Sequence, residues 1–86
     1  MKVIKISAVW CSACIVMNKV WKDVKTSYSD IEFEELDLDF DEDEVKQYNV
    51  GDTLPVIIFI NDSIEKERLI GEKTKGEICN FIERNR

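Results

Sequence analysis

The 86-residue sequence contains no histidine, only one proline and three glycines, and three cysteines. Zinc normally takes four ligands, so a structural zinc site would need histidines or a second cysteine pair, and neither is present. No apolar run is long enough to span a membrane, and no basic and apolar leader stands at the N-terminus. We therefore expect no metal, no membrane association and a reducing, cytoplasmic setting.

Positive charge is also scarce, with 12 Lys and Arg against 18 Asp and Glu and a net charge of −6. Because nucleic acids and anionic membranes attract a basic surface, this balance argues against both as partners. Much of the acidic excess lies between Glu32 and Glu44, where we interpret it as a solvated face and the start of a helix. The remaining composition, 44% hydrophobic and 35% charged, is typical of a single globular domain over residues 1–86, which we expect to be a monomer.

Two of the cysteines stand close together in the segment Trp-Cys-Ser-Ala-Cys at residues 10–14. Residues 3–6 before it have the pattern of a buried strand, and apolar residues follow it at helical spacing as far as Tyr28. Cys11 is therefore expected at the start of a helix, where unpaired N–H groups and the helix dipole stabilise a thiolate. Cys14 lies one turn further on. The pattern favours a thiol–disulfide exchange site, with half of a metal site and an inert cysteine pair as alternatives.

The rest of the chain continues as alternating strands and helices. The hairpin turn is expected at Asn61–Ser63, and a capping box at Thr74–Glu77 begins the last helix. A strand, a helix and a strand in succession imply a parallel pair with a right-handed crossover. Strands are predicted over residues 2–7, 31–38, 56–60 and 64–70, and helices over 11–28, in a short segment that opens with the acidic run 39–44, and from 74 onward.

This order, with Trp10 before the cysteine pair, Leu54-Pro55 before a β-run and Gly71 after the last strand, resembles the thioredoxin family from Val3 to Ile82. The resemblance implies an α/β thioredoxin-like fold, β-α-β-α-β-β-α. It implies a mixed four-stranded sheet of order 2-1-3-4 with helices on both faces. The sequence has no counterpart of the extra N-terminal strand and helix of full thioredoxins, so we expect a minimal version of the fold, of glutaredoxin size.

The same resemblance implies roles for individual residues. Cys11 would be the attacking thiolate and Cys14 the buried resolving thiol of a redox-active disulfide. Pro55 would be a cis proline packed against that disulfide, with a plain loop proline as the alternative. Trp10 would shield the disulfide, with a simple core anchor as the alternative. The implied substrate-binding residues are Trp10, Ser12, Ala13, Leu54 and Pro55.

Three positions depart from the family pattern. Ser12-Ala13 replaces the usual Gly-Pro, and we expect a more oxidising pair than thioredoxin's roughly −270 mV. The loop Gly51–Thr53 carries one apparent extra residue beside the substrate groove, which affects partner preference. Lys5 and Glu35 stand where family members have a buried aspartate and a lysine.

Strand alternation places Lys5 and Glu35 on faces that allow them to meet across adjacent strands. We predict a salt bridge between them beneath the active site, and a catalytic role in removing the proton of Cys14. The alternative is a pair of charges that snorkel to solvent at the sheet edge.

These observations together predict a thioredoxin-like disulfide reductase. It would act on disulfide-containing proteins, take electrons from a partner of the thioredoxin reductase type and need no cofactor. A glutaredoxin-like, glutathione-dependent enzyme is one alternative; Thr53-Leu54-Pro55 favours it, and the single Gly71 in place of a Gly-Gly-acid clamp opposes it. The other alternative is a thioredoxin-fold scaffold whose cysteines are idle or hold a metal.

Cys79 is expected to pack as a small residue beside the apolar stripe of the last helix.

Overall fold

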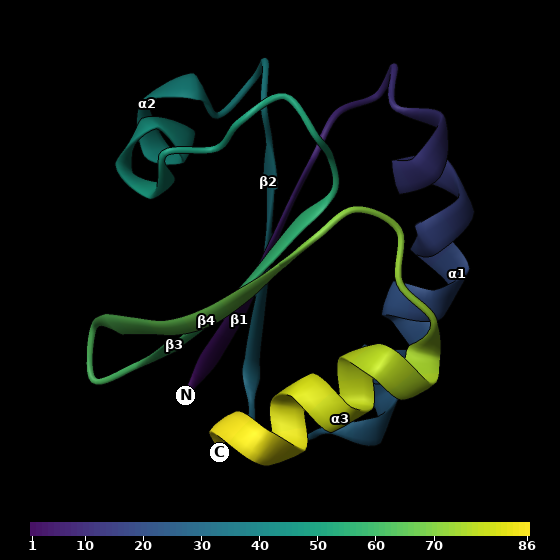
Figure 1. The fold of residues 1–86 in the computed structure, drawn as a ribbon, viewed down its shortest axis with the longest axis vertical. Helices are drawn as coiled ribbons and strands as arrows, with labels where there is room; N and C mark the ends of the chain where they lie inside the picture. The colour runs from purple at the N-terminus through teal and green to yellow at the C-terminus, as the bar shows by residue number, and fades with distance from the viewer.

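The computed structural model describes residues 1–86, which form one mixed four-stranded sheet with helices on both faces (Figure 1). The sheet order is β2-β1-β3-β4; β1 is parallel to β2 and antiparallel to β3, and β3 is antiparallel to β4. The predicted element order and sheet order are confirmed. The elements are β1 (Lys2–Ser7), α1 (Ser12–Ser27), β2 (Glu32–Asp37), α2 (Glu42–Val45), the 3₁₀ turn η1 (Lys46–Tyr48), β3 (Val56–Asn61), β4 (Ile64–Ile70) and α3 (Lys75–Asn85).

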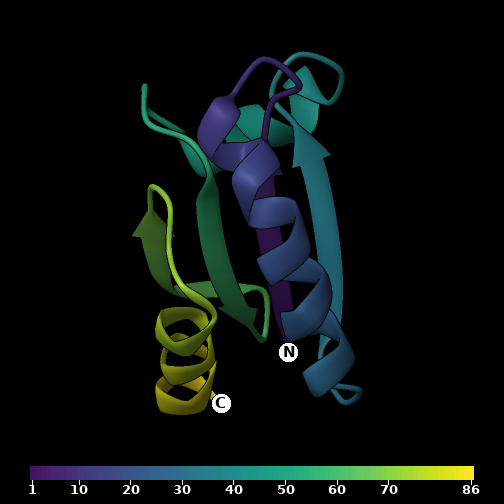
Figure 2. The ribbon, with the colours of Figure 1, turned by 90° about the vertical axis from the view of Figure 1, so that its right-hand side faces the viewer.

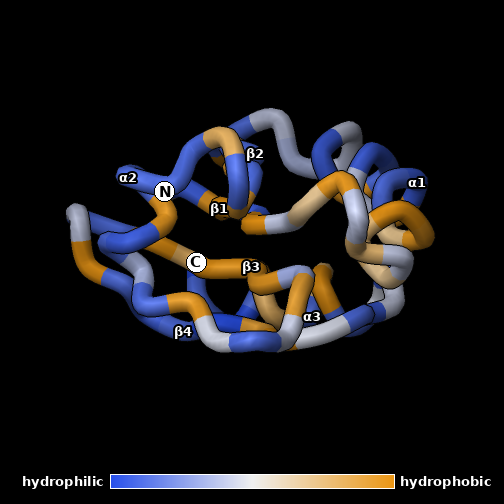
Figure 3. The backbone as a smooth tube through the Cα atoms, turned by 90° about the horizontal axis from the view of Figure 1, so that it is seen from above, coloured by the Kyte–Doolittle hydropathy of each residue, from blue (hydrophilic) through white to orange (hydrophobic).

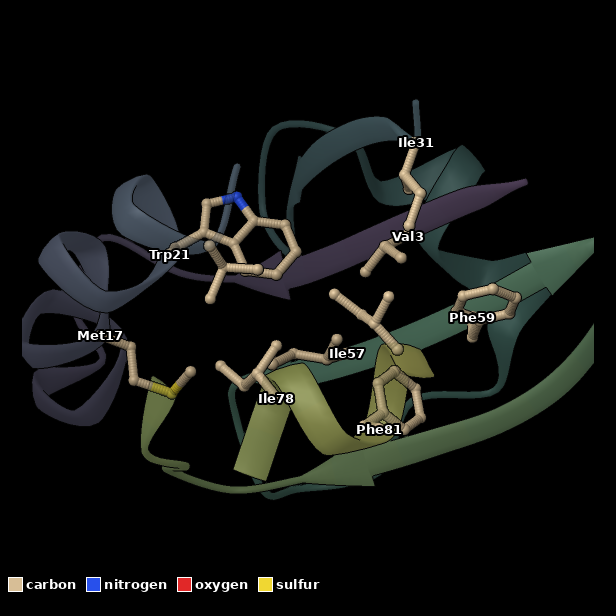
Figure 4. Close-up of a cluster of buried hydrophobic side chains, with 10 residues drawn as sticks. Val3, Met17, Trp21, Ile31, Ile57, Phe59, Ile78 and Phe81 are labelled. Carbon is tan, nitrogen blue, oxygen red and sulfur yellow. The ribbon is translucent and has the colours of Figure 1, made fainter. Parts of the chain in front are cut away.

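Helices α1 and α3 cover one face of the sheet and enclose the first of two apolar cores (Figures 2 and 4). Trp21 of α1 meets Phe33 of β2 edge to face, with ring centroids 5.5 Å apart. Each large apolar side chain buried in this way contributes roughly 1.5–3 kcal/mol to folding. The buried members of the first core are Val3, Met17, Trp21, Val24, Ile31, Ile57, Phe59, Ile78, Phe81 and Ile82.

The second core lies on the opposite face, where α2 packs. Alternation along β1 sends Val3 and Lys5 to the first face and Ile4 and Ile6 to the second, as predicted. The central strand β3 is apolar on both faces, whereas α2 is polar (Figure 3). The second core includes both cysteines of the motif, so the same packing that stabilises the sheet also positions them. Its buried members are Ile4, Ile6, Ala8, Cys11, Cys14, Leu36, Val45, Leu54, Val56 and Ile58.

The hairpin between β3 and β4 turns at Asp62 and Ser63, which both have positive φ, 55° and 63°. Two such residues in succession give a turn whose twist matches the flanking strands. The capping box of α3 is also present, because the N–H of Glu77 donates to Thr74 Oγ1 over 3.2 Å and the Thr74 N–H donates to Glu77 Oε1 over 3.4 Å. Both predicted features are therefore confirmed. None of the helices has the length and apolar character that a bilayer crossing requires.

Glu67 fastens the end of α3 to the edge strand β4. Arg84 donates to its carboxylate over 2.9 Å from Nε, and Asn85 donates over 2.8 Å from Nδ2. The Arg84 hydrogen bonds, followed by that of Asn85, lower the pKa of Glu67 to about 2. A carboxylate whose pKa falls on folding stabilises the protein above its unfolded pKa, near 4.5, and loses this effect as the pH falls toward 2.

We therefore expect Glu67→Gln to lower the stability at pH 7 and to match the wild type at pH 2. The free energy of unfolding, measured by urea titration at pH 7, 4 and 2, tests this. Glu72→Gln is the matched control, because Glu72 is exposed and makes no ion pair. A stability difference for Glu67→Gln that stays constant from pH 7 to pH 2 would contradict the assignment.

Candidate active site

Cys11 is the residue from which helix α1 begins. Its backbone is extended, with φ −88° and ψ 111°, and its Sγ accepts a hydrogen bond from the N–H of Cys14 over 3.3 Å. The N–H of Cys11 donates to the carbonyl of Ala8 over 3.1 Å, which holds the preceding loop. The first turn of α1 contains no carboxylate that would compete for the helix dipole. The free N–H groups and the dipole of α1 therefore favour negative charge on the Cys11 sulfur. The predicted place of Cys11 at a helix start is confirmed.

Cys14 lies one turn further along α1, with 3% of its surface exposed. Burial raises the pKa of the Cys14 thiol to about 11, and its hydrogen bond with Cys11 acts in the same direction. The backbone at Ala8 and the charge of Lys5 act in the opposite direction. Both cysteines are free thiols in this structure. At neutral pH Cys14 is therefore a protonated, shielded thiol behind Cys11.

A groove of about 350 Å³ runs beside Cys11. The Leu54–Pro55 peptide bond is cis, as the resemblance implied, and Pro55 is buried. The Pro55 carbonyl accepts from the N–H of Gly71 over 2.8 Å, and Gly71 has a φ of 93° that favours glycine. The groove is lined by Trp10, Cys11, Ser12, Ala13, Asp52, Thr53 and Leu54.

Trp10 stands at the rim of this groove with 62% of its surface exposed, so the alternative of a core anchor is wrong. Its Nε1 donates to Asp39 Oδ2 over 2.8 Å, which fixes the indole against the turn after β2. The structure thus brings four of the five predicted substrate-binding residues to one groove. Pro55 is the fifth, and it is not among the lining residues.

Lys5 and Glu35 are Cα partners in the β1–β2 register, and Lys5 Nζ lies 3.2 Å from Glu35 Oε1. The predicted salt bridge is therefore present. Lys5 is 1% exposed, which makes the snorkelling alternative wrong for this residue, whereas the Glu35 side chain is 49% exposed. Lys5 Nζ also donates to Asn18 Oδ1 over 3.2 Å and lies 5.4 Å from the centre of the Trp21 ring. A buried charge that lost its partner would cost about 3–5 kcal/mol, so these contacts are what allow a lysine here.

Asn18 is a residue that the sequence analysis missed. It lies one helical turn after Cys14, and with Cys14 and Asp37 it lines a hollow of about 230 Å³. Asn18 therefore bonds to Lys5 and lines the same hollow as the resolving thiol. Its spacing of four from Cys14 was the one available signal, because residues four apart share a helix face.

Cys79 stands apart from this site. It packs on α3 against the first core, whereas Cys11 and Cys14 belong to the second. Burial, followed by a hydrogen bond with Cys79, raises the pKa of Tyr28 to about 12. The expected packing role of Cys79 is confirmed. No three His, Cys, Asp or Glu side chains are grouped so that they could hold a metal ion.

A larger hollow of about 600 Å³ contains no cysteine. Its lining includes Met1, Lys2 and Tyr48, and it has no group suited to thiol exchange. The chemistry of the thiols therefore places the candidate active site at the smaller groove beside Cys11.

Comparison with known proteins gives the same fold and sequence pattern. The family model Thioredoxin matches residues 1–84. Thioredoxin H7 of Arabidopsis thaliana is 32% identical over 84 residues, covering 98% of this chain and 64% of that protein. Thioredoxin H5 of Oryza sativa subsp. japonica is 35% identical over 69 residues, covering 80% of this chain and 50% of that protein. The chain thus spans about half to two thirds of the length of these two relatives.

Solved thioredoxin structures superpose closely on this fold. Thioredoxin NaTrxh from Nicotiana alata has a TM-score of 0.91 and 28% identity, with 99% of this chain and 72% of that chain covered. Thioredoxin of Fasciola hepatica has a TM-score of 0.91 and 25% identity, with 99% of this chain and 80% of that chain covered. Because the family match extends over residues 1–84 and the fold recurs in these structures, the chain belongs to the thioredoxin family.

Proposed function

We propose that this protein is a thiol–disulfide oxidoreductase that reduces disulfides in other proteins through Cys11 and Cys14. The observation that carries the proposal is the Cys11 sulfur at the start of α1, bonded to the Cys14 N–H over 3.3 Å and bordering an open groove. Cys11 is 9% exposed and lines this groove, whereas Cys14 is 3% exposed and does not, a difference that an inert cysteine pair or a scaffold role would not need. Membership of the thioredoxin family supports the same activity.

The exchange takes place in two steps that move two electrons from this protein to its substrate. The Cys11 thiolate attacks one sulfur of the substrate disulfide, forms a mixed disulfide and releases one substrate thiolate. Cys14 then loses its proton and attacks the Cys11 sulfur, which forms the Cys11–Cys14 disulfide and releases the second substrate thiolate. Both substrate thiolates take up protons from water. A reductase partner returns two electrons and regenerates the two thiols.

The second step depends on how Cys14 loses its proton. Burial makes this loss unfavourable, because it raises the pKa of Cys14 to about 11. The charge of Lys5 lowers that pKa, and Glu35 and Asn18 hold the Lys5 ammonium in place. We assign Lys5 and Glu35 to the site as positioning residues that favour the Cys14 thiolate. Whether they also pass its proton to solvent stays a prediction.

The partners follow from the same proposal. Substrates are disulfide-containing proteins, and the electron donor is a reductase of the thioredoxin reductase type. The setting is the reducing cytoplasm, where such a couple contributes to electron transport and cell redox homeostasis. The family match and the absence of a recognisable glutathione clamp in the sequence support this assignment.

The mixed disulfide on Cys11 is an intermediate that can be trapped. Cys14→Ser, incubated with a protein disulfide, should accumulate a stable mixed disulfide on Cys11, because no thiol remains to resolve it. Non-reducing electrophoresis and peptide mapping by mass spectrometry would identify the bond. Cys11→Ser should form no adduct, and Cys79→Ser should turn over like the wild type. An adduct on the Cys11→Ser variant would contradict the assigned roles.

The effect of Lys5 on Cys14 can be measured through the second step of the exchange. Lys5→Met removes a charge that favours the Cys14 thiolate, so resolution of the mixed disulfide should be about tenfold slower at pH 7, equivalent to roughly one pKa unit. Its rate profile between pH 6 and 9 should move to higher pH. Glu35→Gln should give a smaller shift, since Glu35 is half exposed. Thermal unfolding checks the fold of both variants, and a profile that does not move would limit the pair to a structural role.

The electron donor can be identified by comparing two reducing couples. The oxidised protein should be reduced quickly by NADPH with thioredoxin reductase and slowly by glutathione with glutathione reductase. NADPH oxidation at 340 nm follows both couples. Faster reduction by glutathione would support the glutaredoxin-like alternative, and no reduction by either couple would support the scaffold.

A further inference from the structure

The groove beside Cys11 contains a single charged side chain, that of Asp52. Asp52 makes no hydrogen bond and no ion pair, and it lies in the exposed loop that leads to Leu54. The rest of the groove is apolar or neutral, including the exposed indole of Trp10. A substrate segment that enters the groove therefore meets an apolar surface with one uncompensated negative charge beside the reactive sulfur.

The surroundings of the groove carry the same sign of charge. The turn after β2 and helix α2 lie at the same end of the sheet as the start of α1 (Figures 1 and 2). No lysine or arginine lines the groove or either of the two hollows next to this end. The seven ion pairs of the molecule use Asp30, Glu34, Glu35, Glu65, Glu67 and Glu83, which leaves the acids at the active-site end unpaired. These unpaired acids are Asp37, Asp39, Asp41, Glu42, Asp43 and Glu44.

One of these acids is joined to the rim of the groove itself. Asp39 accepts a hydrogen bond from the Trp10 indole N–H over 2.8 Å. The row of acids therefore extends from α2 to the rim of the groove. A field of one sign over a recognition surface raises the encounter rate of oppositely charged partners and slows that of like-charged ones. Such a field does not alter the bond exchange, and it weakens as salt is added.

We propose that Asp52 is a specificity-determining residue and that the groove selects protein disulfides flanked by lysine or arginine. The apolar contacts of Trp10 and Leu54 take the substrate backbone and its apolar side chains, while Asp52 meets the cation next to the attacked cysteine. Acidic disulfides, including the anionic glutathione disulfide, are disfavoured by the same charge. The inference rests on the proposed function, because it concerns which disulfides Cys11 attacks.

Three matched cystine peptides test this inference. They share one sequence and differ only at the residues beside the cystine, which are lysine, glutamine or glutamate. Stopped-flow kinetics would measure the rate at which the reduced wild type reduces each peptide. The ionic strengths are roughly 0.01 and 1 M, where the Debye length is about 30 and 3 Å. We expect the lysine peptide to react about tenfold faster than the glutamate peptide at low salt, the lower end of electrostatic steering, and the preference to disappear at high salt.

Asp52→Asn and Asp62→Asn separate the groove from the net charge. Both variants remove one negative charge, but Asp62 lies in the β3–β4 turn at the opposite end of β3 from the cysteines. In Asp52→Asn we expect the lysine peptide to react only roughly threefold faster than the glutamate peptide, about half of the wild-type preference on a logarithmic scale. In Asp62→Asn we expect the ratio to stay near tenfold. The ratio of lysine to glutamate peptide within each variant corrects for any change in basal rate.

Equal rates for the lysine and glutamate peptides at low salt would overturn the inference. Equal effects of Asp52→Asn and Asp62→Asn would also overturn it, because they would trace the preference to net charge. In both cases the glutamine peptide is still reduced, and the proposed function stands. Failure to reduce the glutamine peptide would overturn the proposed function itself.

Discussion

The hydrogen bond from the Cys14 N–H to the Cys11 sulfur, 3.3 Å long, is the contact on which the site depends. It makes a thiol the capping group of α1, where other helices commonly use a serine, threonine, asparagine or aspartate oxygen. The nucleophile and the start of the helix are therefore one structural feature. Because α1 packs through Met17 and Trp21 into the first core, the packing of this helix fixes where the Cys11 sulfur lies.

A buried cation below this site is the second constraint. The Lys5 ammonium is held by Glu35 and Asn18, and it lies over the Trp21 ring. Its positive charge favours the Cys14 thiolate, while Asp52 lines the groove and Asp39 is bonded to Trp10 at its rim. The charges are thus divided between two depths: a cation inside, acting on the resolving thiol, and anions outside, acting on what approaches Cys11. The two effects can be separated experimentally because one changes a pH profile and the other a salt dependence.

Most of the fold and the contact between Lys5 and Glu35 were predictable from the sequence, because a strand period of two assigns each residue to a face. The cis Leu54–Pro55 bond followed only from the family resemblance, since few X-Pro bonds are cis. The place of Trp10 at the groove followed from the family resemblance, whereas its hydrogen bond to Asp39, 29 residues away, was not predicted. Asn18 was not predicted, and Asp52 was identified only as part of the Gly51–Thr53 loop beside the groove. Their roles depend on how α1 is rotated over β1 and on the path of a loop without periodicity.

The order in which the three cysteines react with iodoacetamide at pH 7 tests the central claim most directly. Peptide mapping at short reaction times would give the rate at each thiol of the reduced protein. The account predicts that Cys11 is modified first and that Cys14 is modified last, since Cys14 is 3% exposed and burial raises its pKa to about 11. Modification of Cys14 as fast as that of Cys11 would contradict it.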